Sequence, residues 1–233
     1  MVKVSSCFIK AGEEVTIAYV PPVVNPEERH QRFQQYGFTC QCALCKIEDG
    51  LDEKSLADLH NKFIDEVTPS IHKLGLNAIP ILKKHVAEIK KVYAKHGQNK
   101  FMFHLIDPLC VLALLYKMQK RIKESLDTYE KAFVYYSNIT NVDAYLNNDE
   151  RLNDEPMYYS PTLQLVVEQL VLGYRDLGEL HKAEKWARLV ILYESFGGLD
   201  SVAARKKHCE LFRGLHVQPT PRALSKRKTW MLE

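Results

Sequence analysis

Three cysteines fall within six positions of the chain, in the stretch GFTCQCALC (37–45), with the spacing Cys40-x-Cys42-x-x-Cys45. Thiolates are soft ligands that bind zinc strongly, and short spacings let one loop supply several of them without strain. A closed tetrahedral zinc site needs four ligands, so a fourth must come from elsewhere. The chain offers three further candidates for that place, none at a short and characteristic spacing: Cys7, His30 and His60.

Composition indicates an ordinary globular protein of one or two domains. The chain has 233 residues, of which 46% are hydrophobic and 26% charged, enough for a sizeable core. The formal net charge of +3 does not favour nucleic acid as a direct partner.

The sequence shows no membrane-spanning or secretion signal, which bears on the compartment in which the protein is found. No apolar run approaches the roughly 20 residues of a membrane span, and the first residues, MVKVSSCFIKAGEEV, hold no signal-peptide core. We therefore expect a cytoplasmic or nuclear protein with no membrane association. In that reducing environment clustered cysteines are more often metal ligands than disulfides. Two further cysteines, Cys110 and Cys209, fall in helical patterns and are predicted to be small buried residues.

The first fifty residues differ in kind from the rest. The segment EEVTIAYV (Glu13 to Val20) is β-branched and alternating, which predicts a strand. A short helix is predicted from Pro26 to about Tyr36, directly before the cysteines. One strand and one short helix cannot bury a core alone, so we expect this region to be the end of a larger domain.

From Asp52 onward the hydrophobic periodicity is helical, and two helices have a clear start signal. Asp107-Pro108 and Ser160-Pro161 each combine a capping residue with proline at the first helical position. Five apolar stripes at helical spacing predict five helices: Leu82, Val86, Ile89 and Tyr93; Leu109, Leu112, Ala113 and Tyr116; Ile122, Leu126, Tyr129, Phe133 and Tyr136; Leu163, Val166, Leu170, Tyr174 and Leu177; Leu180, Ala183, Ala187 and Val190. A last helix is predicted from about Asp200 to Phe212.

These helices form pairs that repeat along the chain. A shift of 58 positions places Tyr116 on Tyr174, Ile122 on Leu180, Ser125 on Ala183 and Phe133 on Ile191. The stretch LGYRDLGELHKAEKWARLV resembles a tetratricopeptide repeat, with Gly178 at the turn and Ala183 where the two helices touch. The insertion NITNVDAYLNNDERLNDEPMYY (138–159), rich in Asn and acids, is predicted to be a surface loop.

The N-terminal motifs resemble a known family. The order IKAGEEVTIAYV, then a gap with Pro26, Glu28 and Arg29, then YGFTCQCALC, resembles the C-terminal end of SET-domain protein lysine methyltransferases with their post-SET zinc loop. A tetratricopeptide-like helical region behind that loop is similar to the SET-and-MYND subgroup. The N-terminal resemblance covers about residues 2–46.

This resemblance implies a role for six residues. Tyr19 occupies the position of the family's catalytic tyrosine. Tyr36 occupies that of an aromatic residue lining the target-lysine channel, and Phe38 that of an aromatic residue packing against S-adenosylmethionine. Cys40, Cys42 and Cys45 occupy the positions of three zinc ligands. In the family the fourth ligand is a cysteine just after an Asn-His motif. An aromatic channel suits methyl transfer, because it orients a lysine amine and favours its neutral form.

We therefore expect a mainly α protein, in which a tetratricopeptide-like helical-hairpin array follows a small β and zinc-loop remnant of a SET domain. The expected divisions are a truncated SET end (1–36), a post-SET zinc loop (37–50), a helical domain (51–213) and a basic flexible tail (214–233). The Asn-His and glycine-rich cofactor motifs precede the family's C-terminal end, so we expect a fragment that does not bind S-adenosylmethionine alone. Its partner would be a protein substrate, such as a histone or another lysine-containing protein.

Two other interpretations stay open. The function could lie in the helical repeats, as a module that binds peptides, with a vestigial SET end. Alternatively, the chain could be a small zinc protein that uses Cys7 or a histidine as the last ligand.

Overall fold

All regular structure in the described part of the chain is helical. The structure, a computed structural model, describes residues 20, 26–50, 53–95, 102–137, 139–154 and 161–218. Every regular element in these ranges is a helix, which confirms the prediction of a mainly α protein. The predicted strand Glu13–Val20 and tail 214–233 lie outside the described residues, except for Val20 and residues 214–218.

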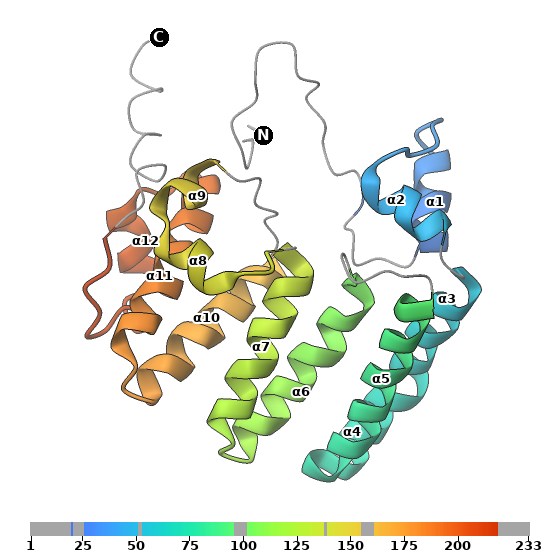
Figure 1. Cartoon of the computed structure of the whole chain (residues 1–233), viewed down its shortest axis with the longest axis horizontal. Coiled ribbons are helices and arrows are strands. Elements are labelled where there is room, and N and C mark those ends of the chain that lie inside the picture. Colours follow the sequence, from blue (N-terminus) through green and yellow to red (C-terminus); the bar gives the residue numbers. More distant parts are fainter. Residues whose placement is uncertain are drawn as a thin grey trace. The chain divides into compact units, whose positions relative to one another are not determined.

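The chain divides into two compact units between residues 138 and 139. The first unit contains the helices α1 to α7 (Figure 1). Their bounds are α1 Pro26–Gln34, α2 Ala43–Asp49, α3 Glu53–Lys62, a π-helical turn Phe63–Val67, α4 Thr68–Leu74, a 3-10 turn Gly75–Ala78, α5 Ile79–Lys95, a 3-10 turn Phe103–Leu105, α6 Ile106–Met118 and α7 Ile122–Ser137.

The second unit contains the helices α8 to α12. Their bounds are α8 Val142–Asn147, α9 Asp149–Asp154, α10 Pro161–Asp176, α11 Leu180–Phe196 and α12 Ser201–Lys207. The division between the units falls inside the region 51–213 that was expected as one helical domain, and the predicted domain boundaries remain predictions.

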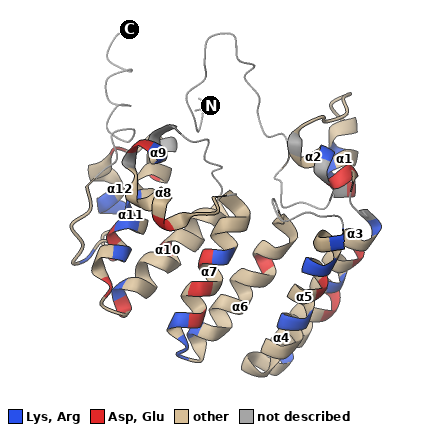
Figure 2. Cartoon of the chain, viewed as in Figure 1, with Lys and Arg blue, Asp and Glu red and all other residues tan. Residues whose placement is uncertain are grey.

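The predicted apolar stripes form the cores of both units. In the first, Ile89 and Tyr93 of α5 pack with Leu109 of α6, and Leu82 packs with Leu112 and Tyr116. The lysines of α5 lie mostly on its exposed side (Figure 2): Lys83, Lys84, Lys91 and Lys95. Two predicted members of the stripes are instead exposed at the α10–α11 turn, because Leu177 and Leu180 flank its tip.

The two helix pairs α6–α7 and α10–α11 close with the same turn. In the first, Lys120 has φ +61° and the amide of Arg121 donates to the carbonyl of Tyr116 at 2.9 Å. At the positions 58 residues later, Gly178 has φ +76° and the amide of Glu179 donates to the carbonyl of Tyr174 at 2.9 Å. A left-handed residue at this place satisfies the last carbonyls of the first helix. The hairpins α6–α7 and α10–α11, which lie in different units, therefore share one turn geometry.

Small residues lie where the helices of each hairpin meet. In α6–α7 the hydroxyl of Ser125 donates to the carbonyl of Ala113 at 2.8 Å. In α10–α11 the equivalent residue is Ala183, which is fully buried.

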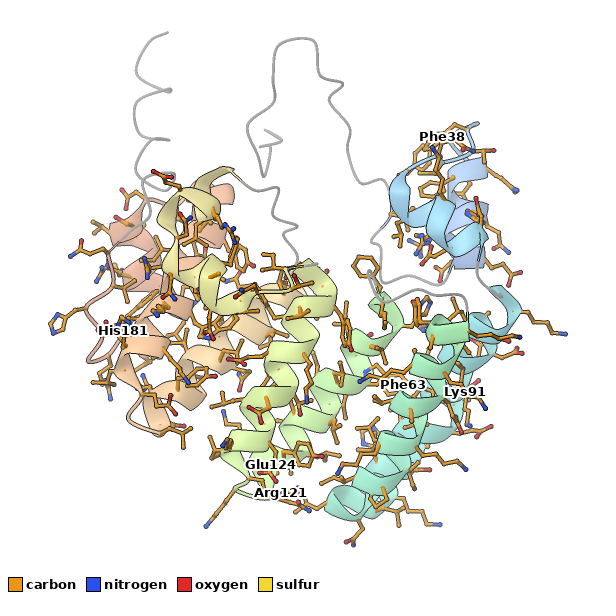
Figure 3. All side chains as sticks on the ribbon, viewed as in Figure 1. Phe38, Phe63, Lys91, Arg121, Glu124 and His181 are labelled. Carbon is orange, nitrogen blue, oxygen red and sulfur yellow. The ribbon has the colours of Figure 1, made fainter. Side chains whose placement is uncertain are left out.

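Replacing Ala183 by leucine should destabilise the second unit by about 1–3 kcal/mol, because the added atoms overfill a packed contact. The measurement is urea unfolding followed by Trp186 fluorescence in a Trp230→Phe background. The neighbouring exposed residue His181, which points away from the helices in Figure 3, provides the control variant His181→Leu. Equal stability of the two variants would contradict the close approach at Ala183.

The prediction of a surface loop for the insertion 138–159 is wrong for its described part. Residues Val142–Asn147 and Asp149–Asp154 form α8 and α9, which bury Tyr145, Leu146 and Leu152. The asparagines that suggested a loop act as caps. The Asn141 side chain accepts a hydrogen bond from the Ala144 amide at 2.9 Å, and that of Asn148 accepts from the Glu150 amide at 3.0 Å.

The last predicted helix is shorter than expected, and Cys209 is exposed and not buried. Helix α12 ends at Lys207, and the next residue, His208, directs its Nε2 to the buried carboxylate of Glu194 at 2.6 Å. Lys207 reaches the same carboxylate at 2.8 Å. These contacts hold α12 on α11 and leave Cys209 on the outside of the turn.

Candidate metal centre

The cysteines lie on the short segment that joins α1 to α2. After α1, Gly37 adopts φ +73°, a conformation that other residues rarely take, and its amide donates to the carbonyl of Gln34 at 3.0 Å. The chain then reverses, so that Cys42 stands at the N-cap position of α2 and Cys45 in its first turn. The segment predicted as a zinc loop therefore includes a helix that positions two of the three cysteines.

The structure brings the three predicted ligands together. The Sγ atoms of Cys40, Cys42 and Cys45 lie within 4.8 Å of one another, and all three thiols are free. Sulfurs on one tetrahedral zinc ion stand about 3.8 Å apart, as bonds of about 2.3 Å require. The donor set and its spacing thus fit a metal ion after a small closing movement.

The electrostatics of the three thiols also favour a metal. Burial, and then the neighbouring sulfurs of Cys42 and Cys40, raises the pKa of Cys45 to about 12. Burial would also raise the pKa of Cys42, but hydrogen bonds from the Cys45 backbone and from the other two thiols lower it. The thiolate of Cys42 is therefore favoured over that of Cys45, and each further thiolate is opposed by the first. A divalent cation removes that opposition.

No further ligand joins the cluster from the described residues. Of the candidates, His30 has its Nε2 3.9 Å from the Asp49 carboxylate, and His60 lies in the helical body, on α3. Cys7 lies outside the described residues. The described part of the chain thus offers three of the four ligands that a closed tetrahedral site would need.

Two of the three aromatic residues with predicted roles, Tyr36 and Phe38, directly precede the cysteines in the sequence and lie in the described part of the chain. Phe38, labelled in Figure 3, is 36% exposed, and its ring centroid is 5.4 Å from that of Phe33 on α1. Tyr36 is 59% exposed. Tyr19 lies outside the described residues. The roles of all three as catalytic, channel and cofactor residues remain predictions.

A buried ion pair joins α1 to α2 next to the cysteines, and sequence reasoning missed it. The Arg29 guanidinium pairs with the Glu48 carboxylate, and both side chains are almost fully buried. The available signal was helical spacing: Arg29 and the buried Phe33 are four residues apart, and so share one face of α1.

Sequence reasoning also missed a histidine cluster in the first unit. A cavity of about 10 Å³, room for one water molecule, is lined by nine residues: Leu59, His60, Phe63, His85, Ile89, Phe103, His104, Asp107 and Pro108. Burial lowers the pKa of His85 and lowers that of His104 to about 4, so both rings are neutral near pH 7. The Tyr93 hydroxyl lies 2.7 Å from His104 Nδ1, and Phe63 stacks on His85 at 5.5 Å. These contacts join residues from distant parts of the sequence, and no local motif indicates them.

Comparison with known protein families and with curated proteins finds no match for this chain. None of the helices in the described ranges has the length and apolar character needed to cross a membrane. The fold and the site together define a mainly helical protein with three cysteines placed to bind a metal ion, consistent with zinc.

Proposed function

We propose that Cys40, Cys42 and Cys45 supply three ligands of a structural zinc ion, and that this zinc module is the C-terminal end of a SET-type protein lysine methyltransferase. The convergence of the three sulfurs within 4.8 Å carries the zinc part of the proposal. The methyltransferase part rests on the resemblance of residues 2–46, with Tyr19, Tyr36 and Phe38 in the order that this family has.

The zinc ion would act as a structural cross-link. Bound thiolates would fix the segment 40–45 against α1, where Cys45 and Cys40 already pack with Phe33 and Val20. This would hold Phe38, next to the cluster, in a defined place. In the family, an aromatic at that place packs against the methyl donor, so zinc would support the cofactor site indirectly.

Two measurements on the endogenous protein test this proposal separately. An antibody to residues 214–233 captures the protein, whose intact mass and zinc content are measured. The captured protein is then assayed with labelled S-adenosylmethionine and histones, beside a Tyr19→Phe variant. Where the intact mass is well above 26.9 kDa, so that the captured protein includes the cofactor-binding part of a SET domain, we expect bound zinc and methyl transfer that Tyr19→Phe abolishes. Zinc without cofactor binding or methyl transfer would contradict the methyltransferase part alone.

A second candidate function is peptide binding by the helical hairpins. The matching turns of α6–α7 and α10–α11 favour a tetratricopeptide-like array, which commonly binds extended peptides. A peptide partner that still binds after deletion of residues 1–50 would support this function. A partner that needs the cysteine module would count against it.

A further inference from the structure

The surface where α1 meets α2 places a cation beside the cysteine cluster. Arg29 and Phe33 lie four residues apart on one face of α1, and Cys45 and Glu48 lie three apart on one face of α2. Phe33 packs with Cys45, and Arg29 pairs with Glu48. All four side chains are buried, so water screens their charges weakly.

Arg29 interacts electrostatically with all three cysteines. Burial lowers the pKa of this guanidinium, and negative charge on Cys45, Cys42, Tyr93 and Cys40 acts in the opposite sense. The Arg29–Glu48 ion pair lies one helical turn from the contact between Phe33 and Cys45, so the cation stands next to the sulfur cluster. Arg29 is thus flanked by two acidic neighbours: the thiol cluster and the Glu48 carboxylate.

A metal at this site would increase the need for such a cation. One divalent ion bound to three thiolates has a net charge of −1, and a fourth thiolate would make it −2. The buried carboxylate of Glu48, one helical turn after Cys45, adds another negative charge nearby. Without a cation between them, the two groups would repel each other in a poorly solvated place.

We propose that Arg29 is a positioning residue of the metal site, whose guanidinium compensates the charge of the metal–thiolate cluster while Glu48 orients it. This inference rests on the zinc site proposed above. It assigns opposite effects to the two partners of one ion pair. Loss of Arg29 weakens metal binding, whereas loss of the charge on Glu48 does not.

The test compares the zinc affinity of four variants of the full chain with that of the unchanged chain, by competition with a chromophoric chelator. Removal of an outer-shell partner commonly lowers metal affinity by about 10–100-fold. We expect a loss of that size for R29Q and recovery of most of it in R29K, which keeps the charge. E48Q should bind zinc at least as tightly as the unchanged chain. The double variant R29Q/E48Q leaves no buried charge without its partner. Its zinc affinity should therefore lie between that of R29Q and that of the unchanged chain.

Cobalt binding and one control variant show whether a loss of metal affinity comes from the changed charge or from misfolding. The cobalt–thiolate charge-transfer absorption should keep its shape in E48Q and R29K, because the three sulfurs still coordinate the ion. The matched control is R32Q, since Arg32 is exposed on the same helix and pairs with Glu28. Circular dichroism confirms that each variant is folded.

Three outcomes are decisive. Equal losses of affinity in R29Q and E48Q would overturn the inference, because the pair would then be only a structural link. If R29Q does not fold, E48Q still decides, since a tenfold loss in that variant contradicts charge compensation. Failure of the unchanged chain to bind one zinc or cobalt ion would instead refute the proposed zinc site itself.

Discussion

Replacing Cys45 by serine will lower zinc affinity by about 100-fold or more and leave no ion on the chain after gel filtration. Structural zinc sites contribute about 10–16 kcal/mol shared among their ligands, so the loss of one thiolate is large. Cys45 is the most buried of the three cysteines, at 1% exposure, and packs with Phe33. A serine hydroxyl is a poor zinc ligand and does not lose its proton as a thiol does.

Zinc content per chain after gel filtration is the direct readout, with cobalt absorption as the second. The control is Cys209→Ser, because Cys209 is exposed and belongs to the other unit. A Cys45→Ser protein that retains one zinc ion would show that the three cysteines do not form the site. In the unchanged chain, a chelator should raise amide hydrogen exchange in α2 more than in α5, because α2 begins among the ligands.

Acid will destabilise the first unit through His104, by about 3 kcal/mol between pH 6.5 and pH 4. Burial, and then the charges of His60 and Arg29, lowers the pKa of His104 from 6.5 to about 4. In this window the unfolded chain binds a proton at His104 and the folded chain does not, so stability falls as the pH falls. The loss is complete below about pH 4, where both states bind the proton.

Other titratable groups near the cavity also change how the stability of the first unit depends on pH. The pKa of His85 is lowered by burial, so His85 adds to the acid effect. The pKa of Asp107 is raised by burial, so Asp107 acts in the opposite sense at low pH. Comparison with a variant that lacks only His104 removes these shared contributions.

Urea unfolding of the unchanged chain and of His104→Gln, each at several pH values, isolates the effect. The variant should be less stable at pH 7, because Tyr93 loses a partner, but its stability should change less between pH 6.5 and pH 4. His72→Gln, on the exposed side of α4, is the control. Circular dichroism follows both units, and Trp186 fluorescence in a Trp230→Phe background follows the second unit as an internal reference. Parallel curves for the unchanged chain and His104→Gln would contradict the prediction.

The helices could be predicted from the sequence wherever their cores are repetitive. The stripes of α5, α6 and α7 are confirmed, because a helix that packs on one side must repeat its apolar residues at that spacing. The insertion could not be predicted in the same way. Asn141 and Asn148 are typical both of loops and of helix caps, and only the burial of Tyr145 and Leu152 separates the two cases.

In the candidate site too, the features set by local sequence could be predicted and those set by tertiary packing could not. The cysteines are neighbours in the sequence, so their convergence follows from one turn and one helix start. Arg29 and Glu48 meet only when α1 packs on α2, and the histidines of the cavity come from α3, from α5 and from the 3-10 turn Phe103–Leu105 before α6. Such contacts depend on tertiary packing and have no spacing that a motif could show. The assigned roles of Tyr19, Tyr36 and Phe38 stay predictions from resemblance alone.

The closeness of the three cysteines along the chain affects when the metal can be captured. Loop-closure entropy rises with the number of residues enclosed, and the segment 40–45 encloses very few. Three thiolates can therefore meet on one ion before any helix of the body has formed. Because synthesis proceeds from the N-terminus, the proposed zinc ion would be able to bind a nascent chain before α5 to α12 have been synthesised. The zinc concentration during translation would then decide whether the site is filled. Helix α2 would form after the cysteines at its start have bound the ion.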